Sequence, residues 1–299
     1  MDILVAGGNG FIGGHLVPEL LDDDHEVTVL ARSPDSNALP DAVETVSGDI
    51  TAYDSIESAV AGHDAVVNLV ALSPLFKPKG GDRMHDEVHR HGTENLVRAA
   101  EAGGVDRFVQ LSALGADPNG ATAYIRAKGQ AEAHVTDSEL DGVLIRPSVV
   151  FGEGGEFVSF TKKLKGMFAP GVPVYPLPGG GKTRFQPIYV DDLVGMLAET
   201  LTDDAHVGET YELGGPDNLT LREITNMVYE AEGKSVSIVS VPMALAGVGL
   251  TLGGKIPGFP MGADQYRSLQ FDNTTADNDI GAFGVEVDDL TTLADYLGV

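Results

Sequence analysis

The chain has 299 residues, 42% of them hydrophobic, with 45 acidic against 19 basic side chains and a formal net charge of −26. This length and apolar content favour one large α/β domain, or a domain with a smaller lobe, over disorder. The negative charge argues against nucleic acid and anionic lipid as partners. The chain has no cysteine, which excludes disulfides and thiolate chemistry, and no apolar run of the ~18 residues that a membrane helix needs.

The acidic residues are spread along the chain, as in DDDHE (22–26) and VDDL (190–193), rather than gathered in one tail. Such a surface either docks a basic partner or is adapted to high salt, where self-repulsion is screened. We favour the second interpretation. The first segment, MDILVAGG, has a buried-strand pattern rather than the basic start of a signal peptide. The sequence therefore predicts a cytoplasmic protein of a halophilic organism.

Short runs rich in Val, Ile and Leu alternate with helical patterns over the first 150 residues. Such runs, buried on both faces, are typical of parallel strands. The predicted strands are 3–7, 26–31, 42–48, 64–70, 107–112 and 142–147. The predicted helices are Phe11–Leu21, Tyr53–Val60, Asp82–Ala102 and Ala121–Leu140. The alternation predicts an α/β fold with a doubly wound parallel sheet, a Rossmann fold, over residues 1–150.

After Pro147 the alternation loosens, and Gly/Pro-rich loops such as APGVPVYPLPGGGK and GKIPGFPMG separate the elements. Helices are expected near 191–202 and 219–232, and strands at 209–214 and 235–241. Residues 151–299 are therefore predicted to form a smaller C-terminal lobe, with some segments returning to the first domain. Because ligands bind beyond the carboxyl ends of such a sheet, we expect this lobe to bind the substrate.

Three glycines of VAGGNGFIGGHL (5–16), namely Gly7, Gly10 and Gly13, lie between the first predicted strand and the first predicted helix. A helix N-terminus offers free N–H groups and the positive end of the helix dipole to a pyrophosphate. At the first strand–helix junction, with five strands following, this spacing predicts a dinucleotide-binding turn. The alternative is tight helix–strand packing without a ligand.

The residues at the end of the second predicted strand indicate whether the nucleotide is NAD or NADP(H). Where an NAD site usually has an acid for the ribose 2′-OH, this chain has Ala31, followed by Arg32 and Ser33. A guanidinium favours the 2′-phosphate of NADP(H), although an arginine in a solvated turn is the alternative. After the third strand, Asp49 could place a carboxylate near the adenine amino group.

Tyr124 and Lys128 lie four residues apart on a predicted helix and so share one face. A nearby ammonium lowers a tyrosine pKa from ~10. Tyr124 could then exchange a proton with a carbonyl or alcohol oxygen while nicotinamide exchanges hydride with the carbon. Ser112, at the end of the fifth strand, could supply a third hydrogen bond to that oxygen. A YxxxK pair alone is usually a solvated helix face, but after a dinucleotide turn and a serine-ended strand it predicts a catalytic set of Ser112, Tyr124 and Lys128.

A series of motifs then carries a family resemblance: GGNGFIG, LARS, GDI, NLVA, HGTENLVRAA, LSALGAD, YIRAK and LIRPSVVFG. In that order they resemble the extended and atypical short-chain dehydrogenase/reductase superfamily. PLPGGGKTRFQPIYVDDLVGML and ADQYRSLQFDN are similar to the branch that contains the NADPH-binding accessory subunit of respiratory NADH dehydrogenase. The likeness covers nearly the whole chain and implies a Rossmann domain that binds NADP(H).

The resemblance also implies roles for residues at matching motif positions. It places Gly7, Gly10, Phe11 and Ile12, with Asn9 in the same turn, at the pyrophosphate, and Arg32 and Ser33 at the 2′-phosphate. It places Asp49 and Ile50 by the adenine, Ala71 by the ribose, and Tyr124, Lys128 and Pro147 at the nicotinamide end. Family members often carry two or three serines after the fifth strand, the last of them catalytic. Here Ala113 and Leu114 follow Ser112, so this serine lies one or two positions early.

Three further segments are less specific. His85, His89 and His91 have no clear fourth ligand, so we interpret them as solvent or cofactor-edge positions and predict no metal site. FTKKLKGMF (160–168) is interpreted as a solvated amphipathic helix, with contact to an anionic partner as the alternative. The apolar start of VPMALAGVGLTLGGKIPGFPMG (241–262) predicts a helix buried against the second lobe. The alternatives are the wall of an apolar substrate crevice or a patch that docks onto a membrane complex.

Together these features predict an NADP(H)-dependent oxidoreductase that acts on a small carbonyl or alcohol substrate. Two alternatives stay open. One is a non-catalytic accessory or assembly subunit that holds NADPH and docks peripherally on a membrane respiratory complex. The other is an NAD-dependent sugar-nucleotide epimerase or dehydratase that uses the same tyrosine. Arg32 argues against the epimerase, because epimerases of this superfamily usually keep an acid for NAD.

Overall fold

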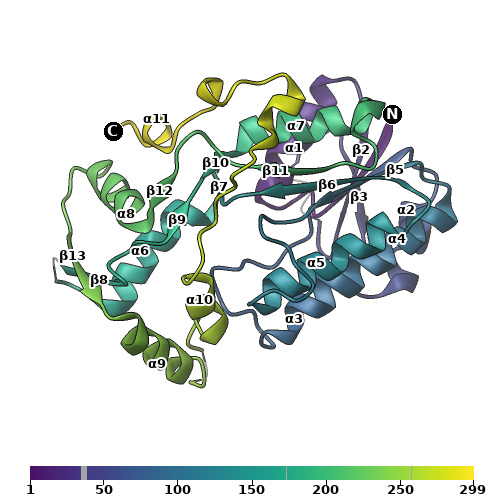
Figure 1. The fold of residues 1–299 in the computed structure, drawn as a ribbon. Coiled ribbons are helices and arrows are strands. Elements are labelled where there is room, and N and C mark those ends of the chain that lie inside the picture. Colours follow the sequence, from purple (N-terminus) through teal and green to yellow (C-terminus); the bar gives the residue numbers. More distant parts are fainter. Residues whose placement is uncertain (35–38, 173, 257) are drawn as a thin grey trace. The chain divides into compact units, whose positions relative to one another are not determined.

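A computed structural model describes residues 1–34, 39–172, 174–256 and 258–299 (Figure 1). The end of the segment VLARSPDS, and one proline in each of two Gly/Pro-rich loops (Pro173 and Pro257), lie outside the described residues. The chain divides into two compact units, which are described separately. Unit 1 comprises residues 1–72, 80–147 and 190–212, and unit 2 comprises residues 73–79, 148–189 and 213–299.

Unit 1 is built on a seven-stranded parallel sheet with the strand order β11-β6-β5-β4-β1-β2-β3. The strands are β1 (Asp2–Ala6), β2 (Glu26–Ala31), β3 (Glu44–Ser47), β4 (Ala65–Asn68), β5 (Arg107–Leu111), β6 (Asp141–Pro147) and β11 (Thr210–Leu213). The first strand pairs in parallel with β2 on one side and with β4 on the other, so the strand order reverses between β1 and β4. The predicted doubly wound parallel sheet is confirmed, and its reversal point is where such folds bind ligands.

Helices cover both faces of this sheet. Figure 1 shows α1 and α7 on one face and α2, α4 and α5 on the other. The helices are α1 (Phe11–Asp22), α2 (Glu57–Val60), α3 (Arg83–His85), α4 (Gly92–Gly103), α5 (Ala123–Thr136) and α7 (Val190–Thr202), with short 3-10 turns at Tyr53–Ser55 and Asp204–His206. A π-helical turn, Asp86–His91, joins α3 to α4 within the single helix predicted over 82–102. The helix and strand expected near 191–202 and 209–214 are α7 and β11, which extend the layers of unit 1.

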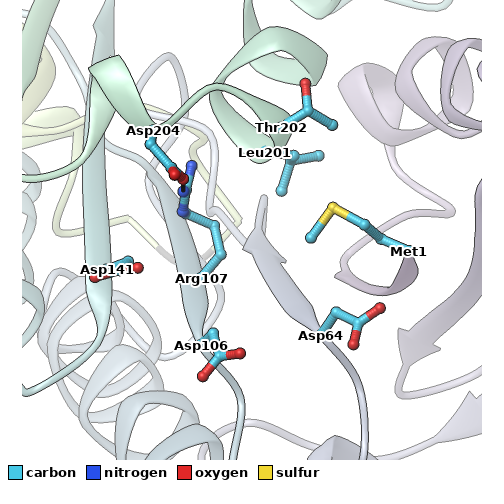
Figure 2. Close-up of a pocket in the computed structure, with 8 residues that line it drawn as sticks. All are labelled: Met1, Asp64, Asp106, Arg107, Asp141, Leu201, Thr202 and Asp204. Atoms are coloured by element: carbon cyan, nitrogen blue, oxygen red, sulfur yellow. Dashed lines mark hydrogen bonds and ion pairs between the residues drawn. The ribbon is translucent and has the colours of Figure 1, made fainter.

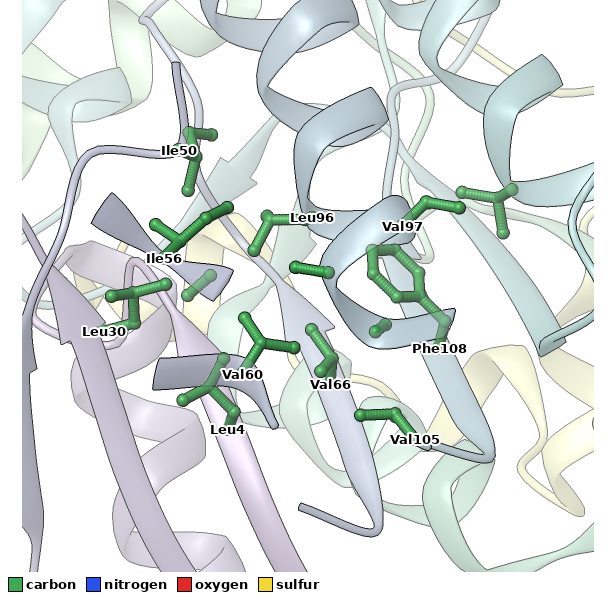
Figure 3. Packing of buried hydrophobic residues seen from close by; sticks show 14 of the residues in the cluster. Leu4, Leu30, Ile50, Ile56, Val60, Val66, Leu96, Val97, Val105 and Phe108 are labelled. Atoms are coloured by element: carbon green, nitrogen blue, oxygen red, sulfur yellow. The ribbon is translucent and has the colours of Figure 1, made fainter. Parts of the chain in front are cut away.

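The core of unit 1 explains why the central strands are rich in apolar residues. All four residues of β4 and all five residues of β5 are buried, because helices cover both faces of the sheet. Leu4, Val66 and Phe108 from three neighbouring strands pack with Leu96 of α4 and with Ile56 (Figure 3). This core holds the strand ends, and therefore the loops that follow them, in fixed positions.

Unit 2 contains three two-stranded sheets, β10-β7, β12-β9 and β13-β8. Its strands are β7 (Val150–Phe151), β8 (Val174–Pro178), β9 (Arg184–Phe185), β10 (Ile188–Tyr189), β12 (Leu219–Thr220) and β13 (Ser237–Val241). Its helices are α6 (Glu156–Phe168), α8 (Leu221–Glu230), α9 (Met243–Gly253), α10 (Ala263–Ser268) and α11 (Leu293–Leu297), with 3-10 turns at Asp279–Phe283 and Val287–Asp289. Thr220 and Glu223 form a capping box that starts α8. Within the described ranges, no helix has the length and apolar character needed to cross a bilayer.

Candidate functional site

The glycine turn follows β1 directly. Gly7 has a φ of +84°, a conformation that favours glycine, and a Cβ at this position would lie 3.1 Å from the backbone nitrogen of Val70. A Cβ on Gly13 would lie 2.4 Å from the Cα of Gly8, so α1 packs against the turn without a side chain between them. A Cβ on Gly10, by contrast, would contact only the Gly7 carbonyl oxygen. Two of the three glycines thus allow close backbone packing, and the third leaves the turn open above α1.

The N-terminus of α1 is suited to an anion. Gly10 is the N-cap residue, no side chain caps the helix, and its first turn contains no acid, although the chain is strongly acidic. The first backbone N–H groups of a helix have no partner within the helix. Asn9 and Gly10 are exposed, and Phe11 and Ile12 are half-buried. This open, uncapped helix end therefore fits a pyrophosphate group.

The neighbouring strands end at the same edge of the sheet, because all of them are parallel. Arg32 and Ser33 follow β2 and are both exposed, and Arg32 forms no ion pair with any residue that the structure describes. Asp49, after β3, accepts hydrogen bonds on Oδ1 from the backbone and hydroxyl of Thr51 at 3.0 and 2.8 Å. The other residues expected at this edge are Ile50, buried after β3, Ala71, exposed after β4, and Pro147, buried at the end of β6.

Tyr124 and Lys128 share one face of α5, as predicted. The side chain of Thr122 caps this helix by accepting a hydrogen bond from the Ile125 backbone at 3.2 Å. Lys128 is 2% exposed, and its Nζ donates a 2.8 Å hydrogen bond to the carbonyl oxygen of Leu111, the last residue of β5. Burial lowers the pKa of Lys128 to about 8, against the attraction of the Glu132 carboxylate, which raises it. The lysine thus ties α5 to the end of the fifth strand.

The expected effect of Lys128 on Tyr124 is not what the structure shows. Tyr124 is partly buried, and this burial raises the pKa of its hydroxyl above the usual value. The predicted lowering of that pKa is wrong, because loss of water disfavours the phenolate and the ammonium is directed to the Leu111 oxygen. The tyrosine is therefore neutral at physiological pH.

Ser112 directs its hydroxyl to an unpredicted partner. It donates a short hydrogen bond to Oε1 of Glu132, a buried carboxylate on α5. Glu132 in turn accepts hydrogen bonds from Arg146 Nε at 2.9 Å and from a terminal guanidinium nitrogen of Arg146 at 2.7 Å. This network links β5, α5 and β6 and occupies the Ser112 hydroxyl proton.

Two histidines pack against the tyrosine. The ring centroids of His85 and His89 lie 5.5 and 5.3 Å from that of Tyr124, both in edge-on arrangements. Both histidines are buried, so of the two expected positions, solvent or cofactor edge, the solvent position is excluded for them, whereas His91 is partly exposed. His89 Nε2 accepts a 3.3 Å hydrogen bond from the Leu72 backbone, and burial, then Lys128 and His85, lower its pKa well below the usual value. Its Nδ1 has no hydrogen-bond partner among the described residues.

Comparison with known proteins assigns this arrangement to a family. The model of a family described as NAD(P)H-binding matches residues 7–167. The chain belongs to this NAD(P)H-binding family. It is 29% identical over 293 residues to the Arabidopsis thaliana protein named "NADH dehydrogenase [ubiquinone] 1 alpha subcomplex subunit 9, mitochondrial", over 92% of this chain and 71% of the relative.

Two further relatives carry different names. A Mycobacterium tuberculosis "3 beta-hydroxysteroid dehydrogenase/Delta 5-->4-isomerase" is 30% identical over 263 residues, which is 78% of this chain and 70% of the relative. The crystal structure of a dTDP-glucose 4,6-dehydratase from Streptomyces venezuelae, with NAD and TYD bound, matches with a TM-score of 0.68 and 25% identity. That match covers 81% of this chain and 84% of the solved one. The expected resemblance to dehydrogenases and epimerases of this superfamily is confirmed.

One cavity of this NAD(P)H-binding protein lies at the amino ends of the sheet strands, at the edge opposite the glycine turn. Its volume is about 390 Å³, and Asp64, Asp106 and Arg107 line it beside the amino ends of β4 and β5 (Figure 2). Ligands of such folds bind at the carboxyl ends of the strands, so this acidic hollow is not the nucleotide site. Among the described residues, the one group with metal-ligand spacing is Glu199, Asp203 and His206, on α7 and the turn after it.

Proposed function

We propose that this NAD(P)H-binding protein is an NADP(H)-dependent oxidoreductase that reduces the carbonyl group of a small-molecule substrate. The observation that carries the proposal is the position of Tyr124 and Lys128. Lys128 hydrogen-bonds the last residue of β5, at the sheet edge where the glycine turn after β1 also lies. NADPH bound along this edge supplies a hydride, and a neutral tyrosine beside it supplies the proton that the carbonyl oxygen needs.

The nucleotide is assigned to residues along the carboxyl edge of the sheet. Gly7, Asn9, Gly10, Phe11 and Ile12 would hold the pyrophosphate, which is supported by the uncapped start of α1. Arg32 and Ser33 would bind the 2′-phosphate, which is supported by the exposure of the guanidinium and by the lack of an ion pair with any described residue. Asp49, Ile50, Ala71 and Pro147 would line the adenine, ribose and nicotinamide positions in turn.

Burial gives Tyr124 and Lys128 different roles. Because burial raises the pKa of Tyr124, the hydroxyl keeps its proton at neutral pH and acts as the general acid. Lys128, with a pKa of about 8, is mostly protonated at pH 7 and can donate to the nicotinamide ribose as well as to Leu111. Ser112 would orient Glu132 and Arg146 rather than touch the substrate, since its hydroxyl donates to the carboxylate.

A second candidate is a non-catalytic NADPH-binding accessory subunit. The engagement of Ser112 by Glu132 favours it, because this removes one expected hydrogen bond to the substrate oxygen. The Arabidopsis relative is named as a subunit of NADH dehydrogenase, which supports a docking role at a respiratory complex. An NAD-dependent epimerase is the third candidate, and Arg32 after β2 opposes it.

Nucleotide binding is tested first. The nucleotide released by denaturing the purified protein is identified by mass spectrometry, and NADPH and NADH are titrated into wild type and Arg32→Ala. Charge-assisted pairs contribute ~1.5–3 kcal/mol, so we expect a preference for NADPH of about tenfold or more that Arg32→Ala abolishes. Arg83→Ala, another exposed arginine of unit 1, serves as the control. An unchanged preference in Arg32→Ala would contradict the assignment.

Turnover then separates the enzyme from the accessory subunit. Oxidation of NADPH is followed with a panel of carbonyl compounds. Tyr124→Phe removes only the proton donor, so we expect NADPH affinity to persist and turnover to fall by a factor on the order of 10²–10⁴. Tight NADPH binding without turnover on any compound favours the accessory subunit, and turnover that survives unchanged in Tyr124→Phe refutes the mechanism.

A further inference from the structure

Charge is distributed very unevenly between the two units. Unit 1 carries 31 acidic and 8 basic side chains, whereas unit 2 carries 14 acidic and 11 basic ones. Eight of the nine lysines belong to unit 2, and the ninth, Lys128, is buried in unit 1. Three segments of unit 2, residues 73–79, 157–182 and 235–263, contain no acid at all and seven of these lysines. The net charge of the chain therefore does not describe this part of the surface.

These three segments pack together. Lys77 donates from its backbone to Pro260 at 2.7 Å and from Nζ to the Gly254 carbonyl oxygen at 2.8 Å, which joins the first segment to the third. The rings of Phe76 and Phe160 lie 5.2 Å apart, centroid to centroid, which joins the first segment to the second. The second and third segments also pair through β8 and β13. They form one acid-free face, a name used below for these three segments.

Helix α9 presents an apolar stripe on this face. Leu245, Val248 and Leu252 are spaced three and four residues apart, and they are 64%, 59% and 57% exposed. Ile256, just beyond the helix, is 61% exposed. Only Gly247 and Leu250 of α9 are buried, so the predicted burial of this helix against the second lobe is wrong. A helix with no charged residue is normally covered on all sides, and an exposed stripe of this kind marks an interaction site.

The stripe continues onto the end of α6. The Phe168 ring lies 6.5 Å from that of Phe259, and Phe259 also packs beside Gly253 at the end of α9. Phe168 and Met167 are 42% and 36% exposed. Among the lysines of these segments, Lys162 pairs with Glu232, whereas Lys79, Lys163, Lys165 and Lys255 form no ion pair with the residues that the structure describes. The acid-free face thus combines exposed apolar side chains with four lysines that no carboxylate of the described residues neutralises.

We propose that the acid-free face binds the surface of an anionic lipid bilayer. The stripe of α9 and the end of α6 would enter the boundary between headgroups and acyl chains, and the four lysines would bind lipid phosphates. Charge complementarity selects this occupant, because an anionic surface attracts the unpaired lysines of this face and repels the strongly acidic side chains of unit 1. A second copy of the chain is a poorer partner, because a symmetric contact would bring the same lysines of both copies face to face, and their charges repel. Thr251 is the one hydrogen-bonding side chain of α9, so the helix suits acyl chains better than a polar protein surface.

Vesicle binding by the full chain tests this inference. Binding is measured by flotation with vesicles of phosphatidylcholine alone and with vesicles that also contain one-fifth phosphatidylglycerol, at 0.15 M and 1 M salt. We expect binding to the anionic vesicles only. Each surface lysine contributes ~1 kcal/mol, about fivefold, so Lys163→Glu/Lys165→Glu is expected to weaken binding at 0.15 M salt by at least about twentyfold. At 1 M salt, where the Debye length is ~3 Å, this loss is expected to shrink.

Two matched controls separate the face from general effects. Leu245→Ser/Val248→Ser is expected to weaken binding about tenfold or more at both salt concentrations, because it removes apolar area rather than charge. Val299→Ser, an exposed apolar residue outside the face, and Arg83→Glu, a charge reversal in unit 1, are expected to bind like wild type. Circular dichroism checks that each variant is folded. Equal binding to neutral and anionic vesicles, binding that the face variants leave unchanged, or a dimer in solution that Leu245→Ser/Val248→Ser dissolves would each overturn the inference.

Discussion

Replacing Lys128 by methionine is expected to stabilise the fold at neutral pH. Burial lowers the pKa of this lysine from 10.5 to about 8, which at ~1.4 kcal/mol per unit corresponds to a cost of about 3 kcal/mol for holding the ammonium inside the folded protein. Methionine fills a similar volume without a charge. Its loss of the hydrogen bond to Leu111 costs ~1 kcal/mol, so we expect a net gain of about 2 kcal/mol in the free energy of unfolding at pH 7.

The same substitution also removes a pH dependence of the free energy of unfolding, which in wild type rises with pH above about 8. Between pH 8 and the unfolded value of 10.5, the unfolded chain binds a proton that the native protein has lost. Wild type therefore gains stability as pH rises, by about 2 kcal/mol between pH 8 and 9.5, while Lys128→Met does not. Urea unfolding at fixed salt measures both effects, with the exposed Lys79→Met as the matched control. Parallel pH profiles for wild type and Lys128→Met, or a destabilised variant at pH 7, would refute the reasoning.

Two further substitutions test the packing of the site. Gly13→Ala is expected to lower the free energy of unfolding by more than about 2 kcal/mol and to weaken nucleotide binding, because its Cβ would overlap the Gly8 backbone. The Cβ of Gly14→Ala meets no atom within 4 Å, so this substitution is expected to stabilise α1 by ~1 kcal/mol. Thermal unfolding compares the two variants, and equal effects would contradict the close contact between Gly13 and Gly8. His89→Gln is expected to reduce the loss of stability below pH 6.5, because the unfolded chain protonates this histidine there and the folded protein, with the lowered pKa, does not. The free energy of unfolding measured at pH 5 and pH 7 checks this. If the variant and wild type lose the same stability between these two pH values, a buried neutral His89 is excluded.

The parts of the site that depend on local sequence were predictable. The glycine spacing, the ends of the strands and the face shared by Tyr124 and Lys128 all follow from neighbouring residues, and the structure contains the expected elements. Contacts between distant segments were not predictable in this way. His89 lies 35 positions before Tyr124, and Ser112 finds Glu132 on a helix turn that also faces Arg146. No spacing rule links such pairs.

Two expectations failed because they rested on average behaviour. An ammonium four residues away usually favours the phenolate, but here burial of Tyr124 has the larger effect on its pKa and the ammonium has another partner. An apolar helix is usually buried, but α9 keeps the side chains of Leu245 and Val248 outside. Composition predicts the net charge of the chain but not how the charges are distributed. Only the division into units shows that eight of the nine lysines belong to unit 2.

In the proposed reaction, the groups around Tyr124 favour proton donation to a carbonyl over proton removal from an alcohol. His89 is held neutral by burial, and the Lys128 ammonium donates to Leu111, so neither of them offsets the cost of a buried phenolate. Taking a proton from an alcohol requires that phenolate, whereas giving a proton to a carbonyl starts from the neutral hydroxyl that burial stabilises. For the proposed oxidoreductase, we therefore expect this environment to assist reduction at neutral pH and to oppose oxidation until the pH is alkaline. A pH profile in which oxidation of an alcohol is as fast at pH 7 as reduction of its carbonyl would show that another group carries the proton.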